Sequence, residues 1–220
     1  MIELNNIRKV YGSTSVLRNV NLTVKEGDFI SIRGRSGVGK TTLLRIVGLL
    51  DSPDMGEVKI FGRTTSGLSD EEKSRIRLYS IGFIFQFFNL IPSLTVLENV
   101  ELPLALAGMN RKERRSRVRE LLEYFDIMGL AERFPETLSG GERQRVAVVR
   151  AIANNPKIIL ADEPTSSLDS ENSKILMDLL TKINRERRTT IILTTTDLYE
   201  KLPTNKDYIL KDGNLHQEPI

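Results

Sequence analysis

The sequence predicts an α/β protein with three parts: a core built on a mostly parallel sheet, an antiparallel β region near the N-terminus, and a helical insertion. Three patterns support this class. Short runs that are apolar throughout are typical of strands buried on both faces of a parallel sheet. Segments nearer the N-terminus alternate apolar and polar residues instead, and a middle segment follows the period of a helix.

The alternating segments lie in the first third of the chain. Apolar and polar residues alternate over 20–24 and again over 56–62. A turn at 25–28 leads from the first of these segments into a further strand at 29–32. We expect these pieces to form an antiparallel sheet on the N-terminal side.

The apolar runs lie nearer the C-terminus, at Ile158–Ala161 and Ile191–Leu193. Between them, Leu176 and Leu180 have the spacing of a helix, and strand, helix and strand in this order predict a right-handed crossover in a parallel sheet. Helical spacing within residues 93–153 predicts the insertion. We therefore expect one domain over 1–220, with its core at 1–92 and 154–220 and a helical subdomain at 93–153.

Composition restricts the classes of function. The 220 residues include 32 Lys and Arg against 29 Asp and Glu, a net charge of +3. Six basic residues and one acid fall within Arg111–Arg119, which gives 6 − 1 = +5 locally and 3 − 5 = −2 elsewhere. A broad basic face for nucleic acid is therefore not expected, and we interpret the Arg-rich segment as a solvated helix face.

Several features bear on location and chemistry. The sequence has no cysteine, which excludes disulfides, thiolate metal sites and a cysteine nucleophile. The chain begins without the basic and apolar pattern of a secretory signal. Its longest apolar stretch, 81–92, is too short to span a bilayer, which takes about 20 residues. We expect a chain that is soluble by itself.

A phosphate-binding motif follows the strand at 29–32. Residues 34–41 read G-R-S-G-V-G-K-T and match G-x-x-x-x-G-K-[ST] in full. Glycines let backbone N–H groups wrap a phosphate, the lysine adds a charge at the β- and γ-phosphates, and the threonine hydroxyl is a Mg²⁺ ligand. The expected nucleotide-binding residues here are Gly34, Ser36, Gly37, Gly39, Lys40, Thr41 and Thr42.

Two carboxylates complete this predicted site. Asp162 and Glu163 follow directly after the apolar strand at 158–161. The carboxyl ends of parallel strands are where sites form in open α/β sheets. We expect Asp162 to hold Mg²⁺ through water, and Glu163, which points elsewhere, to accept a proton from an attacking water.

A second anion-binding helix end is predicted at Leu138–Gln144, which reads L-S-G-G-E-R-Q. Ser139 and Glu142 have the spacing of a capping box, so a helix begins here. Gly140 and Gly141 leave its N–H groups open to a close ligand. Because residues 34–41 already hold one set of phosphates, this second end could complete the site of a partner subunit.

This heptad resembles the signature motif of the ATP-binding cassette (ABC) ATPases, and the other motifs occur in that family's order over essentially all 220 residues. The family has a P-loop NTPase core. The segments Phe85–Pro92 and Ala161–Thr165 are most similar to the branch that serves lipoprotein-releasing and macrolide-exporting systems.

The resemblance implies further roles. Tyr11 matches the aromatic residue that stacks on adenine, with Val16 nearby. Gln86 matches the glutamine that senses Mg²⁺ and the attacking water, which adds it to Thr41 and Asp162 as a metal residue. Ser166–Asp169 is similar to the loop that crosses the dimer interface.

The family also implies an assembly. Two such chains, or one chain and a similar subunit, enclose two ATP molecules with Mg²⁺, each between Lys40 of one chain and Ser139, Gly140 and Gly141 of the other. Closure on ATP and opening after hydrolysis would drive a separate integral membrane permease docked beside the Gln86 loop. The chain would then be cytoplasmic and peripheral on the membrane, with no nucleic-acid partner.

One position departs from the family pattern. Members carry a histidine that contacts the γ-phosphate after the last core strand, and Asp197 aligns this position with Thr196; the only histidine, His216, lies in the polar tail. A threonine donates one hydrogen bond but carries no charge. We therefore expect tight ATP binding and slow hydrolysis.

Two alternatives to a transport ATPase remain open. The first is a regulatory module that dimerises on ATP and acts on a membrane partner with little turnover; Glu163 favours the enzyme and Thr196 the module. The second is a DNA-repair or translation ATPase of the same superfamily. It is disfavoured because neither a tandem cassette nor a coiled-coil insertion is visible.

Overall fold

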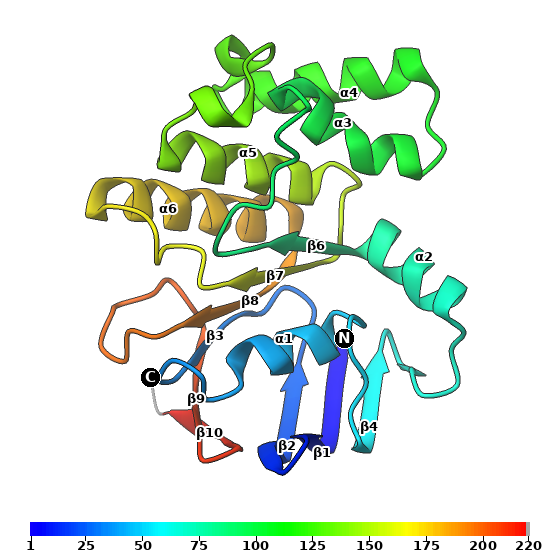
Figure 1. Ribbon diagram of the computed structural model, residues 1–220, viewed down its shortest axis with the longest axis vertical. Coiled ribbons are helices and arrows are strands. Elements are labelled where there is room, and N and C mark those ends of the chain that lie inside the picture. The colour runs from blue at the N-terminus through cyan, green and yellow to red at the C-terminus, as the bar shows by residue number, and fades with distance from the viewer. Residues whose placement is uncertain (219–220) are drawn as a thin grey trace.

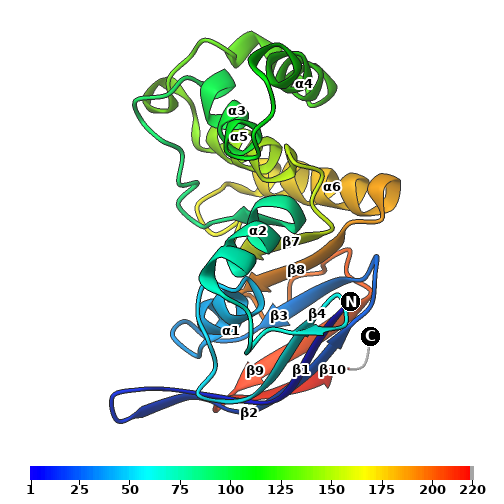
Figure 2. The same cartoon turned by 90° about the vertical axis from the view of Figure 1, so that its right-hand side faces the viewer.

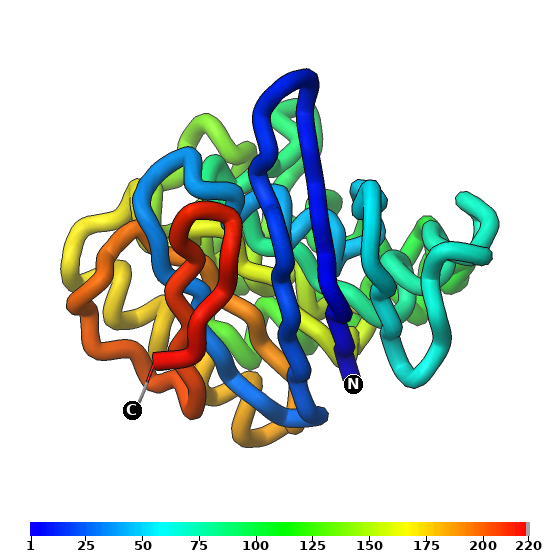
Figure 3. The backbone as a smooth tube through the Cα atoms, turned by 90° about the horizontal axis from the view of Figure 1, so that it is seen from below, coloured from blue at the N-terminus to red at the C-terminus, as the bar shows by residue number. Residues whose placement is uncertain are grey.

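The computed structural model describes residues 1–218, and its N-terminal strands form the predicted antiparallel sheet. The strand order is β2-β1-β4-β5. The bounds are β1 Ile2–Tyr11, β2 Thr14–Val24, β4 Met55–Ile60 and β5 Arg63–Thr64. Figure 3 shows the long β1–β2 hairpin projecting beyond the rest of the chain, which places Tyr11 next to its tip.

The second sheet has the order β10-β9-β3-β8-β7-β6. All its neighbouring strands are parallel except β10, which runs antiparallel to β9. The bounds are β3 Phe29–Arg33, β6 Ile81–Ile84, β7 Ile158–Asp162, β8 Thr190–Thr195, β9 Lys206–Lys211 and β10 Asn214–Glu218. The sole histidine, His216, is exposed on β10.

One strand was expected in the wrong sheet. The segment 29–32 belongs to β3, which pairs in parallel with β8 and β9 rather than joining the antiparallel sheet. All five residues of β3 are buried, as they are in strands covered on both faces, whereas β2 alternates buried and exposed residues. The residue pattern of 29–33 alone does not reveal which neighbours a fully buried strand will have.

Helices cover both faces of the parallel sheet. Figure 1 shows α1 (Lys40–Val47) on one face and α6 (Ser170–Arg187), with α5 (Gly140–Ile152) above it, on the other. Side chains of β3 alternate between two hydrophobic cores: Ile30 packs on the α1 side and Phe29 on the α6 side. The predicted crossover from β7 through α6 to β8 is present.

The segment between β6 and β7 is helical. It contains α3 (Val96–Leu106), α4 (Arg111–Tyr124) and α5, and Figure 2 shows these helices on the far side of α6 from the antiparallel sheet. α4 ends at Tyr124, and Asp126 then adopts φ = 52° and turns the chain before Met128. A further helix, α2 (Asp70–Ser80), connects β5 to β6 and was not predicted.

The Arg-rich helix α4 is only partly the solvated face that the sequence suggested. Arg111, Lys112 and Arg119 are exposed. Arg114 instead forms a 2.5 Å ion pair with Glu101, which is 8% exposed. None of the helices within residues 1–218 is long and apolar enough to cross a bilayer.

Candidate functional site

The loop 34–39 connects the buried strand β3 to helix α1 and has the geometry of a phosphate cradle. Gly39 adopts φ = +111°, and a Cβ atom there would lie 2.7 Å from Val16 Cγ1. Only glycine fits this conformation and this close approach. The loop therefore ends at the N-terminus of α1, where free N–H groups and the helix dipole favour an anion. Thr42 follows in the first turn of α1, and Ser36 and Gly37 are exposed.

Lys40 is almost fully buried, at 4% exposure. Its Nζ donates hydrogen bonds to the carbonyls of Gly34, at 2.8 Å, and Arg35, at 3.1 Å. The same Nζ lies 3.1 Å from Glu163 Oε1. The predicted phosphate-binding lysine and the predicted general base therefore meet in one ion pair.

Asp162, the last residue of β7, is held by two hydroxyl groups. Thr41 donates to its Oδ2 at 2.8 Å, and Thr194 donates to its Oδ1 at 2.7 Å. The parallel register of β7 and β8 sets Asp162 beside Thr194. The sequence reasoning missed Thr194, although a hydroxyl at the end of the strand next to β7 was a usable signal.

Glu163 follows with a left-handed backbone at φ = 45°. Its N–H donates to Thr194 Oγ1 at 3.0 Å and its carbonyl accepts from Ser166 Oγ at 2.9 Å. Left-handed backbone at a residue other than glycine or asparagine is unfavourable and persists only where neighbours hold it. These contacts turn the Glu163 side chain to Lys40 while Asp162 faces Thr41.

Gln86 lies in the loop after β6, two residues beyond the strand. Its side chain is half-buried, and its carbonyl accepts a hydrogen bond from Ser167 Oγ at 3.3 Å. Within residues 1–218 no hydrogen bond joins the Gln86 side chain to Asp162 or Glu163. Farther along the loop, Arg150 of α5 donates to the carbonyls of Phe88 at 2.8 Å and Asn89 at 2.5 Å.

Tyr11 lies beside the phosphate loop rather than in it. Its ring is 46% exposed, and its hydroxyl donates to Asp51 Oδ2 at 2.5 Å. The hydrogen bond to Asp51 raises the pKa of Tyr11. Lys9, 2.8 Å from Asp51 Oδ1, completes this cluster. The contacts fix the ring by its hydroxyl and leave part of its surface free to stack.

The heptad Leu138–Gln144 begins helix α5 as predicted. Ser139 Oγ accepts the Glu142 N–H at 3.2 Å, and Glu142 Oε2 accepts the Ser139 N–H at 2.7 Å, which is the expected capping box. The Ser139 N–H lowers the pKa of Glu142. A Cβ atom on Gly141 would lie 2.0 Å from Asn172 Oδ1, so α5 approaches α6 closely at this point.

The second predicted anion-binding helix end does not meet the phosphate loop of the same chain. Ser139, Gly140 and Gly141 belong to a helix on the opposite side of the sheet from α1 (Figure 1). No hydrogen bond links them to 34–41 in the described part of the chain. The two predicted anion-binding ends therefore lie on different faces of the sheet within one chain (Figure 1).

Thr196 follows β8 directly and is exposed. The preceding residue, Thr195, accepts a hydrogen bond at its carbonyl from the Gly34 N–H at 3.2 Å. The loop that carries Thr196 is therefore attached to the first residue of the phosphate loop.

Comparison with known proteins decides the family. A family model described as "ABC transporter" matches residues 17–166. The chain belongs to the ABC transporter family. It is 48% identical to the uncharacterized ABC transporter ATP-binding protein MJ0796 of Methanocaldococcus jannaschii, over 99% of this chain and 96% of that protein. It is 44% identical to the lipoprotein-releasing system ATP-binding protein LolD of Porphyromonas gingivalis, over 99% and 100%.

Solved structures agree with this assignment of the ABC cassette. The dimeric structure of MJ0796 in a post-hydrolysis state, bound to ADP and Pi, matches with a TM-score of 0.90 at 47% identity, over 99% of this chain and 98% of that one. The predicted family, its likeness to lipoprotein-releasing systems, the fold class and the ATPase class are confirmed. The individual site residues stay predictions.

Proposed function

We propose that two copies of this cassette bind two Mg²⁺-ATP between them and hydrolyse ATP to drive a separate membrane permease. The observation that carries the proposal is the constellation of Lys40, Thr41, Asp162 and Glu163 within hydrogen-bonding distance at the carboxyl end of the parallel sheet. Such a cluster binds phosphate, orders a divalent cation and offers a base for water. These are the requirements for hydrolysing a phosphoanhydride.

The donor set fits Mg²⁺. Thr41 Oγ1 and Asp162 Oδ2 are 2.8 Å apart, and both are hard oxygen ligands. The protein supplies few ligands, which suits an ion that keeps several waters and takes the rest from phosphate. Bound there, Mg²⁺ would neutralise the negative charge of the β- and γ-phosphates. Gln86 would complete this set from the loop after β6.

Glu163 is the base in this proposal. A carboxylate beside the γ-phosphate can orient a water and take its proton, a contribution of about 10²–10⁴-fold in rate. Glu163 follows Asp162 at the strand end, and the two carboxylates have different partners. Asp162 accepts hydrogen bonds from Thr41 and Thr194, whereas Glu163 faces Lys40, so the two acids take different roles in the proposal.

Thr196 limits the rate. Its hydroxyl can donate a single neutral hydrogen bond to the γ-phosphate, where a histidine could also supply charge. Loss of a positioned donor at the reacting group costs about 100-fold in rate. We therefore infer slow turnover and a long-lived ATP-bound pair.

The paired arrangement is supported by the separation of the two anion-binding ends within one chain. Each nucleotide would lie between Lys40 of one copy and Ser139, Gly140 and Gly141 of the other, with the adenine on Tyr11 near Val16. The dimeric structures of MJ0796, a cassette 47% identical to this one, support this assembly.

A groove beside the Gln86 loop supports the permease partner. Its volume is about 600 Å³, and its apolar lining includes Leu50, Phe83, Phe85, Leu102, Leu106 and Pro156. Leu106 is 67% exposed there. We propose that a cytoplasmic segment of an exporter-type or lipoprotein-release-type permease occupies this groove, as the relatives named LolD suggest, and holds the chain at the cytoplasmic face of the membrane.

A regulatory module with little turnover is the second candidate, because Thr196 removes a cationic contact. Turnover and ATP-dependent dimerisation separate the two. We expect Thr196→His to raise kcat about 100-fold and Thr196→Val to lower it further. Glu163→Gln should abolish turnover and accumulate as an ATP-bound dimer in analytical ultracentrifugation. Absence of turnover in both the wild type and Thr196→His, with dimerisation intact, would favour the module.

The permease contact has its own test. Leu106→Asp should abolish co-purification of the chain with its membrane partner without changing turnover of the isolated chain. Met55→Asp is the matched control, because Met55 is 59% exposed on β4 and lies outside the groove. Equal loss of co-purification in both variants would argue against the groove as the docking site.

A further inference from the structure

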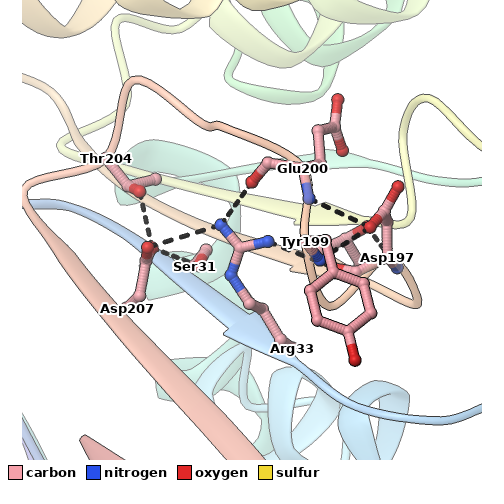
Figure 4. Close-up of polar contacts among 8 residues, drawn as sticks. Ser31, Arg33, Asp197, Tyr199, Glu200, Thr204 and Asp207 are labelled. Atoms are coloured by element: carbon pink, nitrogen blue, oxygen red, sulfur yellow. Dashed lines mark hydrogen bonds and ion pairs between the residues drawn. The ribbon is translucent and has the colours of Figure 1, made fainter. Parts of the chain in front are cut away.

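Arg33 is a buried cation at the end of β3, next to the phosphate loop, and the proposed chemistry does not use it. It is 5% exposed. Its guanidinium donates to the carbonyl of Asp197 at 3.1 Å, to the carbonyl of Glu200 at 2.8 Å and to Asp207 Oδ2 at 3.3 Å. Figure 4 shows the guanidinium between β9 and the loop that follows β8.

Two hydroxyl groups hold the Asp207 carboxylate of β9 in position to contact Arg33. Ser31, two residues before Arg33 on β3, donates to Asp207 Oδ1 at 2.5 Å, and Thr204 donates to the same oxygen at 2.6 Å. Burial by itself would raise the pKa of Asp207, but these hydroxyls and the charge of Arg33 lower it. The carboxylate therefore stays ionised, and the buried charge of Arg33 is compensated.

The loop also holds its own shape. Asp197 Oδ1 accepts the N–H groups of Tyr199 at 2.8 Å and Glu200 at 2.9 Å, which closes a tight turn. The Arg33 guanidinium donates hydrogen bonds to the carbonyls of Asp197 and Glu200, at the two ends of this turn. The turn is thus attached to Arg33 at both of its ends.

The contacts bracket Thr196. The carbonyl before it, on Thr195, accepts from the Gly34 N–H, and the carbonyl after it, on Asp197, accepts from Arg33. Arg33 and Gly34 are consecutive. The backbone of Thr196 is therefore fixed on both sides, by Arg33 at the end of β3 and by Gly34 at the start of the phosphate loop.

We propose that Arg33 is a positioning residue for ATP hydrolysis, which fixes the loop 196–200 to the phosphate-loop strand so that residue 196 faces the γ-phosphate. The inference rests on the proposed function of this site. It accounts for a cation in a strand whose other inward residues are apolar or carry a hydroxyl. Arg33 forms two hydrogen bonds to carbonyls of the loop and one ion pair. The three contacts together fix the position of the loop, whereas a single contact would leave it free to move.

A double-mutant cycle tests the proposal. Arg33→Met should lower kcat about tenfold with less than a twofold change in KM for Mg²⁺-ATP, because small misplacements of a catalytic group cost rate more than binding. In a Thr196→His background the same change should remove most of the gain from histidine. Arg33→Lys, which keeps the charge but has fewer donors, should restore part of kcat. Additive effects of the two substitutions would contradict the proposal.

A loop probe gives a readout that does not depend on turnover. The chain has no tryptophan, and Tyr199 is 92% exposed on this loop, so Tyr199→Trp provides a single tryptophan that can be excited selectively. Arg33→Met should lower its fluorescence anisotropy and speed hydrogen exchange at 197–201 at least tenfold. Unchanged anisotropy and exchange would overturn the inference, even if Thr196→His failed to raise turnover and the proposed function itself were wrong.

The matched control removes a similar ion pair elsewhere. Arg114 binds Glu101 at 2.5 Å and the carbonyl of Met109 at 3.2 Å, within the helical segment. Arg114→Met should leave the anisotropy of the probe and the kcat unchanged. Equal effects of Arg114→Met and Arg33→Met would mean that Arg33 acts only through global stability, which would refute a positioning role.

Discussion

Each of two loops at the carboxyl end of the parallel sheet is held by an arginine side chain, and the two arginines differ in their other contacts. The loop after β8 is held by Arg33, whose charge is compensated by Asp207. The loop after β6 is held by Arg150 through the carbonyls of Phe88 and Asn89. No carboxylate lies within 4.0 Å of Arg150 in residues 1–218, and burial lowers its pKa.

The backbones differ as well. Phe88 and Asn89 are consecutive left-handed residues, at φ = 61° and 49°, whereas the turn at 197–200 is stabilised by Asp197. Left-handed backbone at a bulky residue is unfavourable. Arg150 and Asn89 also line the groove that we assign to the permease. The loop after β6 thus has left-handed backbone and borders the groove, while the loop after β8 is attached to the sheet through Arg33.

This contrast separates two tasks. A strained loop held by carbonyl contacts alone can change shape when a partner binds, which suits it to transmit a signal toward Gln86. A loop whose carbonyls accept from Arg33, itself fixed to β9 by an ion pair with Asp207, suits the placement of a catalytic group. Three substitutions test whether the two loops differ in this way.

The largest effect is expected from Arg150→Met. It removes both donors from the loop after β6 and leaves the left-handed residues without support, so the free energy of unfolding should fall by about 3 kcal/mol. Urea unfolding measures this change, and hydrogen exchange should rise at 86–90 but not at 197–200. Faster exchange in both loops would show that they are not independent.

Asp207→Asn should cost about 2 kcal/mol at neutral pH, because Arg33 loses its charged partner. The lowered pKa of Asp207 adds a pH signature. Its contribution is complete above the ordinary aspartate pKa of 3.8 and is lost as the pH falls through the lower folded-state value. The difference between wild type and variant in urea titrations should therefore begin to shrink below about pH 4, and a constant difference down to pH 2 would contradict the ion-pair account.

The smallest effect is expected from Asn89→Gly. Glycine adopts the left-handed conformation freely and asparagine tolerates it, so the small relief of strain should about offset the higher unfolded-state entropy of glycine, and the free energy of unfolding should change by less than about 0.5 kcal/mol. Asn19→Gly, on the exposed face of β2, is the control and should destabilise. A thermal-shift series with both variants tests whether the left-handed backbone at residue 89 costs stability, since equal destabilisation by Asn89→Gly and Asn19→Gly would show that it does not.

The sequence predicted the motifs whose residues lie next to one another. Their local geometry follows from residue spacing, as in the phosphate loop, the Asp162–Glu163 pair and the capping box at Ser139. Contacts between distant segments could not be predicted in this way. Arg33 and Asp197 are 164 positions apart, and nothing in either neighbourhood indicates the other. The same limit explains the misplaced strand β3, whose neighbours β8 and β9 lie far along the chain.

The contacts of Lys40 have a consequence for the order of events. An ammonium group has three protons; the Lys40 Nζ donates hydrogen bonds to two loop carbonyls, and the Glu163 carboxylate lies 3.1 Å from the same nitrogen. A phosphate oxygen that approaches Lys40 competes with Glu163, the partner outside the loop. Carboxylate ¹³C NMR during an ATP titration would follow the exchange as a shift of the Glu163 signal. Binding of ATP and release of the Glu163 carboxylate from Lys40 are then one exchange of partners.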